Sequence, residues 1–290
     1  MRRFNFCCKW LVAAAVPIVC ASCGDTTGPA EEILHFAVLD VGQGLAQLGV
    51  SGETAIAWDM GPASGFEGWR DGYRTLDSPH LTAIVLSHSD EDHRGGLLML
   101  DSSLSFDGLV VTSPFEDTAL IRRESGAWKD RLRFAQKARG DTIGGLDGVM
   151  VRCLWPPQEI SEEIPLADEY KNRYSLCFRL SYGGTSVFIS SDIDSSALAE
   201  LSRNDGFTLK SDALIVPHHG SRTSIHSGFY GFVLPQLAVV SFGRDNPYGH
   251  PSGDLFDLCF RMQIELRTTA GDGHVMGKSN GYYWIWESIN

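Results

Sequence analysis

The chain has 290 residues, of which 43% are hydrophobic and 21% are charged, and its formal net charge is −12 at pH 7. This length and apolar content fit one large α/β domain or two small ones and exclude wholesale disorder. The acidic balance repels polyanions at long range, which argues against a general nucleic-acid-binding protein because such proteins need a basic face.

The first 22 residues have the pattern of a secretory signal. A basic start precedes a short apolar run, residues 10–19, and small residues follow that run. The run is too short to cross a bilayer, which takes about 20 apolar residues. Ala21-Ser22-Cys23 resembles the end of a bacterial lipoprotein signal, where cleavage leaves a lipidated cysteine. An ordinary cleaved signal peptide is the alternative.

Three segments are therefore predicted. Residues 1–22 form a signal peptide, residues 23–32 a short polar tether, and residues 33–290 one folded domain. We expect an exported lipoprotein held on a membrane by a lipid on Cys23, at the outer membrane or cell surface, facing the periplasm or the exterior. Loss of the basic signal would bring the net charge to about −15. No obligate protein partner is indicated.

From residue 33 onward, short apolar runs alternate with Gly-rich turns and amphipathic stretches, which predicts one α/β domain with helices covering its sheets. The expected strands are Ile33–Asp40, Ala55–Trp58, Thr82–Ser87, Gly108–Thr112, Val149–Trp155, Leu176–Ser181, Ser186–Ser190, Ala213–Val216, Leu237–Ser241 and Gly281–Glu287. The expected helices are Gly95–Leu100, Asp117–Lys137, Ser195–Ser202, Ile225–Leu234 and Gly253–Arg261.

Three cysteines, Cys153, Cys177 and Cys259, lie in the expected domain. They are scattered singly among apolar neighbours and form no Cys-x-x-Cys motif with one another. We predict that they are buried free thiols.

A cluster of histidines and acidic residues follows the strand expected over Thr82–Ser87. Side chains alternate along an extended segment, so His88 and Asp90 point the same way and can hold one metal ion. Asp92 and His93, at the turn, can reach a second position. Nitrogen and oxygen ligands without thiolate suit Zn, Mn or Fe. A solvated acidic turn before a helix would explain the aspartates but not the two histidines.

The segment from Ser87 to Gly96 resembles the His-x-His-x-Asp-His signature of the metallo-β-lactamase superfamily, with Asp90 where the second histidine usually stands. That variant resembles the branch containing the ComEC hydrolase domain and the pneumococcal phosphorylcholine esterase. Four more segments are similar to this branch in the same order, namely residues 40–44, 58–61, 216–221 and 246–251. The resemblance covers roughly residues 33–285.

The resemblance implies an αββα four-layer sandwich that binds two divalent metal ions, Zn or Mn. The implied ligands are His88, Asp90, Asp92, His93, Asp192 and His218, with Asp192 shared by both metals. Which of His218 and His219 binds metal stays open.

The remaining candidate residues have other roles. His219 and His250 are candidate catalytic residues, and for His250 a catalytic or substrate-positioning role is favoured over completion of a metal shell. Asp40 and Asp59 are expected to orient ligand histidines, and Gln43 to line the pocket. Asn172 lies where many superfamily members place a further histidine ligand. No histidine occurs between His93 and His218, which predicts a weaker second metal site.

The resemblance favours phosphodiester hydrolysis by a metal-bridged hydroxide. The enzyme would be nuclease-like or would act on a phosphodiester of an envelope polymer, and the acidic surface disfavours long nucleic acid as its substrate. Two alternatives are a β-lactamase or other amide or ester hydrolase on the same fold, and a non-catalytic surface-binding lipoprotein.

Overall fold

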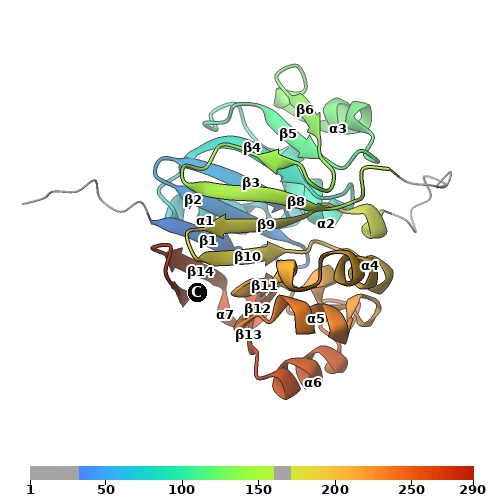
Figure 1. Ribbon diagram of the computed structural model, residues 1–290. Helices are drawn as coiled ribbons and strands as arrows, with labels where there is room; N and C mark the ends of the chain where they lie inside the picture. Colours follow the sequence, from blue (N-terminus) through green and yellow to red (C-terminus); the bar gives the residue numbers. More distant parts are fainter. Residues whose placement is uncertain (1–32, 160–170) are drawn as a thin grey trace, which may run out of the picture. The chain divides into compact units, whose positions relative to one another are not determined.

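A computed structural model describes residues 33–159 and 171–290 of the chain (Figure 1). The expected signal peptide and tether, including Cys23, lie outside the described residues. Among the helices that the structure describes, none combines the length and apolar character needed to cross a bilayer.

The first sheet has eight strands in the order β15-β14-β1-β2-β3-β4-β5-β6. Strand β1 pairs antiparallel with both β2 and β14, whereas β3 to β6 run parallel to one another. The strands are β1 (Leu34–Val38), β2 (Ala46–Ser51), β3 (Thr54–Met60), β4 (His80–Leu86), β5 (Leu109–Thr112), β6 (Arg133–Gln136), β14 (His274–Ser279) and β15 (Trp284–Ile289).

The second sheet has seven strands in the order β13-β12-β11-β10-β9-β8-β7. Strands β10 to β13 are parallel, so their carboxyl ends lie at one edge of the sheet. The strands are β7 (Thr142–Ile143), β8 (Val149–Trp155), β9 (Cys177–Tyr182), β10 (Thr185–Ile189), β11 (Ala213–Ile215), β12 (Leu237–Val240) and β13 (Glu265–Thr268).

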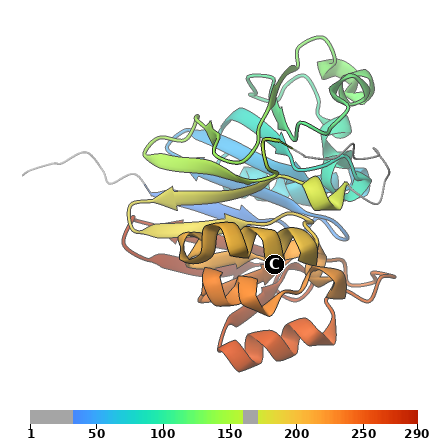
Figure 2. The same ribbon diagram turned by 45° about the vertical axis from the view of Figure 1, so that its right-hand side comes forward.

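Helices cover the outer faces of both sheets. Figures 1 and 2 show three of them, α4 (Ser195–Asp205), α5 (Ser227–Val233) and α6 (Gly253–Met262), together against the second sheet. The first sheet is covered by α1 (Phe66–Thr75) and α3 (Thr118–Glu124). The short helices α2 (Glu91–Arg94) and α7 (Thr269–Asp272) lie in loops.

Three apolar layers hold these elements together. Phe36 and Phe178 are fully buried between the two sheets. Trp69 packs in the layer between the first sheet and its helices, and Phe188 meets Phe229 of α5 edge to face at 5.2 Å in the layer on the second sheet. Because large aromatic side chains bury about 150–250 Å² each, these layers dominate the stabilisation. The predicted αββα four-layer sandwich is thus confirmed.

One expected helix was wrong in its second half. The helix expected over residues 117–137 ends at Glu124, and a 3-10 turn follows at Gly126–Trp128, where Gly126 has φ +51. Residues 133–136 then form β6 and pair with β5. Tertiary pairing beside the buried Trp128 therefore overrides the helical pattern of this segment.

The helix expected over Gly95–Leu100 is a 3-10 helix, Gly95–Met99, that continues from α2. The three cysteines of the domain are buried and free, as predicted.

Candidate metal centre

The candidate site residues lie in loops at the carboxyl ends of five strands. Residues from the ends of β3 and β4 in the first sheet meet residues that follow β10, β11 and β12 in the second. Four residues in these segments, Asp59, Ser191, His218 and His219, have positive φ angles between 48° and 53°. Left-handed backbone is disfavoured for residues with a Cβ, and it is concentrated at functional sites when surrounding structure holds it in place.

Asp59 orients the segment that carries the signature. Its two carboxylate oxygens accept hydrogen bonds from the backbone N–H of Ser87 at 2.8 Å and the hydroxyl of Ser87 at 2.7 Å. Its Oδ2 also lies 2.8 Å from Nδ1 of His93. When the ring is neutral, this contact places the proton on Nδ1, and Nε2 of His93 then faces the site with its lone pair.

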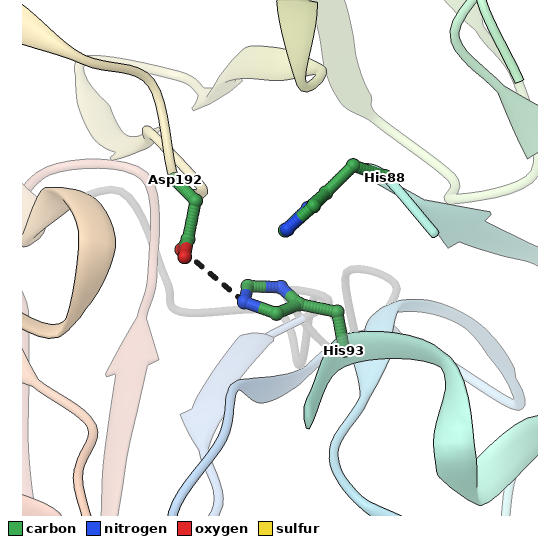
Figure 3. A group of neighbouring side chains, drawn as sticks. All are labelled: His88, His93 and Asp192. Atoms are coloured by element: carbon green, nitrogen blue, oxygen red, sulfur yellow. Dashed lines mark ion pairs between the residues drawn. The ribbon is translucent and has the colours of Figure 1, made fainter. Parts of the chain in front are cut away.

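Asp192 faces the histidines from the second sheet. It follows β10 and is 3% exposed. Its Oδ1 lies 3.2 Å from Nε2 of His93, and the rings of His88 and His93 are 4.2 Å apart (Figure 3). One potential ligand atom from each of these three residues falls within a span of 4.8 Å.

His219 points into the site, and the neighbouring His218 lies at its margin. Nδ1 of His219 lies 2.8 Å from the carbonyl oxygen of Ser241, so Nε2 faces Asp92 at 3.4 Å and Asp192 at 3.7 Å. The His218 side chain is 25% exposed, and its Nε2 lies 3.8 Å from Asp192.

Asp92, His93 and His219 form a second potential metal-holding group. Within the part of the chain that the structure describes, His218 belongs to neither group.

The group of His88, His93 and Asp192, which we call the first group, adjoins residues that are partly exposed to solvent. Oδ2 of Asp90 lies 3.4 Å from Nε2 of His88, and Nζ of Lys171 lies 3.6 Å from Oδ1 of the same aspartate. Glu116 hydrogen-bonds to Ser89 beside this pair, and burial raises its pKa. The first group is therefore adjoined by an ammonium and an additional carboxyl group.

His250 lies beside the two histidines of the β11 loop. Its ring centroid is 5.7 Å from that of His218 and 6.4 Å from that of His219. Asn246 accepts the backbone N–H of His250 at 3.1 Å, and the ring of Tyr248 lies 5.8 Å away. The loop therefore brings an imidazole and an exposed phenol next to the cluster.

The other expected residues support the loops around the site. The Asp40 carboxylate accepts the backbone N–H of Gly42 at 3.2 Å, so its side chain shapes its own turn and does not contact a ligand histidine in the described part of the chain. Gln43 accepts the backbone N–H of Gly243 at 3.2 Å. The side-chain amide of Asn172 lies 3.4 Å from Nε2 of His218.

The electrostatics favour ionised carboxylates paired with a protonated imidazole. Burial alone raises the pKa of Asp192, but His93 and His219 outweigh it and hold that pKa well below its usual range. Burial likewise raises the pKa of Asp92, yet the His219 ring 3.4 Å away and the charge of His93 lower it to about 2. Burial lowers the pKa of His93, but Asp192 and Asp59 raise it well above its usual value.

The donor set fits divalent metal ions. Nε2 of His88, His93 and His219 and Oδ1 of Asp192 are buried and have no hydrogen-bond partner among the described residues. Leaving such polar atoms unsatisfied is costly, at about 1–3 kcal/mol each. Bound cations would satisfy them, and imidazole with carboxylate is the donor chemistry that Zn and Mn accept.

The sequence interpretation missed three contributors to this centre, Ser87, Lys171 and Glu116. Each is an ordinary polar residue without a motif. Only the signature around Ser87 offered a signal, because a hydroxyl directly after a buried strand often bonds the neighbouring loops.

Comparisons with known proteins show which sequences this chain resembles. No protein-family model matches the chain. The chain is 28% identical over 250 residues to Recombination protein 2 of Haemophilus influenzae, which covers 82% of this chain and 28% of the relative. It is 28% identical over 203 residues to ComE operon protein 3 of Bacillus subtilis, covering 67% of this chain and 24% of the relative. The chain thus spans about a quarter of the length of these curated relatives.

A solved structure shows the fold. The metallo-β-lactamase fold protein YhfI from Bacillus subtilis superimposes with a TM-score of 0.55 and 12% identity, covering 84% of this chain and all of that chain. The protein therefore has the metallo-β-lactamase fold, and its candidate metal centre lies at the strand ends described above.

Proposed function

We propose that this protein is a metal-dependent hydrolase of the ComEC type that cleaves phosphodiesters. The observation that carries the proposal is the convergence of buried, unpartnered ligand atoms from His88, His93, His219 and Asp192. The similarity to Recombination protein 2 and ComE operon protein 3 supports the ComEC-type assignment.

The proposed ligands form two unequal sites that share Asp192. Asp92, His93 and His219 would hold one ion, and His88 with Asp90 would hold the other. We assign the ligand role to His219 in place of His218, because Nε2 of His219 is buried and faces two carboxylates. His218 then lies next to the substrate, where Asn172 contacts its ring.

Divalent ions, Zn or Mn, would supply positive charge and would lower the pKa of water toward 7. The residues of the chain then orient the reaction. Asp59 and the Ser241 carbonyl fix the tautomers of His93 and His219, so both Nε2 atoms face the site. Burial lowers the pKa of His250, so its ring would be neutral and would stabilise the departing oxygen by donating a hydrogen bond from its N–H, without transferring the proton.

A paired assay tests this function. Purified protein is analysed for bound metal and is then assayed with bis(p-nitrophenyl) phosphate and, in parallel, with nitrocefin. We expect metal-dependent cleavage of the diester and no cleavage of the lactam. Cleavage of nitrocefin alone would establish the β-lactamase alternative, and metal binding without either activity would establish a binding protein.

Matched variants test the ligands. Asp192→Asn removes the shared carboxylate, and Asp194→Asn, two residues along the same loop, retains an oxygen that can cap α4. We expect only the Asp192 variant to lose metal and activity. His219→Ala should lose metal, whereas His218→Ala should retain it with lower activity. Equal metal content in the two histidine variants would refute the assignment.

We propose further that the protein is exported and held on a membrane by a lipid on Cys23. The pattern of residues 1–23 supports this. Expression of the full chain in a bacterium, followed by mass spectrometry of the mature amino terminus, tests it. A diacylated Cys23, together with release of a Cys23→Ser variant from the membrane fraction, is the expected result, and an unmodified amino terminus would refute it.

A further inference from the structure

A second pocket lies between the edges of the two sheets. It encloses about 330 Å³, which is at the small end of the range of about 300–1,000 Å³ for small-molecule pockets. One wall is aromatic and comes from the hairpin between β14 and β15, in dark red in Figure 1. We call this pocket the aromatic groove and define that wall by Tyr282, Tyr283, Trp284 and Trp286.

The aromatic wall presents both stacked and exposed rings. Trp284 and Trp286 lie on the same side of β15, with ring centroids 5.0 Å apart and planes at 28°. Both pack against the edge of the apolar layer between the sheets. Tyr282 and Tyr283 are 81% and 57% exposed. Exposed aromatic surface next to a cavity is typical of a binding site.

The hairpin is fixed in place without any ligand. Oδ1 of Asn280 accepts the backbone N–H groups of Tyr282 at 3.0 Å and Tyr283 at 3.3 Å. The backbone N–H of Gly184 donates to the carbonyl of Gly281 at 2.7 Å, which ties the hairpin to the second sheet. A wall held this firmly loses little conformational freedom when a ligand binds.

The opposite wall is polar and nearly balanced in charge. The Asp212 carboxylate accepts the backbone N–H of Ser186 at 2.7 Å, and Glu265 pairs with Arg267 at 2.7 Å. The exposed side-chain amide of Gln236 has no hydrogen-bond partner within residues 33–159 and 171–290. These planar groups can each bond two adjacent hydroxyls.

One polar atom of the aromatic wall also lacks a partner. The indole Nε1 of Trp284 is buried and has no hydrogen-bond acceptor within the described ranges. Buried indole N–H groups usually find an acceptor. A ligand oxygen in the groove would supply it.

We propose that the aromatic groove binds a neutral saccharide ring. The C–H face of a sugar ring stacks on aromatic rings, and its hydroxyl edge bonds carboxylate, amide and guanidinium groups. An organic anion would be repelled by Asp212, whereas the paired Glu265 and Arg267 together present no net charge. A neutral, polyhydroxylated ligand meets no repulsion and matches both walls.

The groove is separate from the candidate metal centre. Asp212 directly precedes β11 and Glu265 begins β13, whereas the Pro217–Gly220 turn and Ser241 follow the other ends of β11 and β12. At about 3.3 Å per strand residue, the two sites lie on the order of 15 Å apart. The saccharide site therefore does not rest on the proposed hydrolase function, and its loss should leave catalysis unchanged.

Titration with three neutral hexasaccharides tests the proposal. The probes are the β-1,4-glucose, α-1,4-glucose and β-1,4-N-acetylglucosamine hexamers at up to about 10 mM, since single sugar sites bind weakly. The readouts are tryptophan fluorescence and saturation-transfer NMR of the sugar ring protons. We expect at least one hexamer to bind with both signals. Absence of saturation transfer from all three would overturn the proposal.

Variants locate the site. Replacing both tyrosines, Tyr282→Ala with Tyr283→Ala, should weaken saccharide binding at least tenfold, and Trp284→Phe should weaken it several-fold by removing the indole N–H. Phe260→Ala, at an 87% exposed ring outside the groove, is the control and should bind like the wild type. Phosphodiester cleavage should be equal in all four proteins. Unchanged binding in the tyrosine variant, or displacement of the sugar by tetramethylammonium, would overturn the proposal.

Discussion

Asp59 and His93 are joined by a buried contact of 2.8 Å between Oδ2 and Nδ1, and both side chains are at most 2% exposed. Because Asp59 also holds Ser87 through two hydrogen bonds, one carboxylate fixes both the end of β4 and the ring that faces the site. The orientation of the candidate metal centre thus depends on a residue that belongs to neither potential metal-holding group of the described chain.

Replacing this carboxylate should weaken metal binding without unfolding the protein. Asp59→Asn keeps the size of the side chain but places a donor against an N–H group. Loss of such an orienting partner typically lowers metal affinity about 10- to 100-fold. Isothermal titration calorimetry with Zn²⁺ measures the affinity of the variant and of the wild type.

Asp77→Asn is the matched control, since Asp77 also has a positive φ but lies in the turn before β4. It should bind Zn²⁺ like the wild type. A normal affinity in the Asp59 variant would contradict the orienting role.

Removal of metal should reveal a pH-dependent stability. In the metal-free protein the pKa of His93 is raised, so its ion pairs stabilise the fold below pH 6.5 and are lost as the pH rises through the folded-state pKa. The melting temperature of chelator-treated protein should therefore fall as the pH is raised from 6.5 to alkaline values.

The Zn²⁺-loaded protein should show the opposite trend over the same pH range, because its ligands must lose their protons to bind metal. Differential scanning calorimetry of both forms across this range makes the measurement. If the melting temperatures of the two forms change with pH in the same direction, protons and metal do not compete for His93.

Lys171 should contribute to the binding of anionic substrates. Its ammonium lies 3.6 Å from Asp90 and is about one-third exposed, so a diester at the first site would lie near its positive charge. Lys171→Met removes the charge and keeps the chain length. We expect KM for bis(p-nitrophenyl) phosphate to rise roughly tenfold with kcat little changed, which corresponds to loss of binding common to ground and transition states.

Lys210→Met, at an exposed lysine before β11, is the control for this change and should leave KM unaltered. The KM of the Lys171 variant should also depend less on salt than that of the wild type, because the variant lacks the charge that salt screens. A fall in kcat with KM unchanged would argue instead for a role in the chemical step.

The three cysteines should resist thiol reagents in the native protein. Burial raises the pKa of all three thiols, that of Cys153 to about 12 and that of Cys259 to about 11, so almost no thiolate exists at neutral pH. Peptide mapping after iodoacetamide treatment should find all three unmodified in buffer and alkylated in denaturant. Rapid alkylation of Cys153 in buffer would contradict the burial.

Much of the metal centre was predictable from short segments. His88, Asp90, Asp92 and His93 follow one buried strand, and strand ends of adjacent strands meet at one edge. The assignment between His218 and His219 was not predictable. Both residues have left-handed backbone, and that local geometry decides which ring turns inward.

The errors in secondary structure have separate causes. Strands β2, β7, β13 and β14 were not predicted. In β2 and β14, burial on both faces removes the alternation that marks a strand. Residues 133–136 have a helical pattern but pair with β5. Lys171 was missed because it lies beside Asp90 only in the folded chain, where the two residues are 81 positions apart in the sequence.

The pairing of β1 with β14 has a consequence for biosynthesis. Strand β1 lies between β2, which leaves the ribosome immediately after it, and β14, which emerges some 240 residues later. Until then one flank of β1 presents bare backbone amides to its surroundings. Completion of the first sheet therefore waits for the synthesis of β14, and nascent chains arrested before residue 274 should be targets for chaperones and proteases.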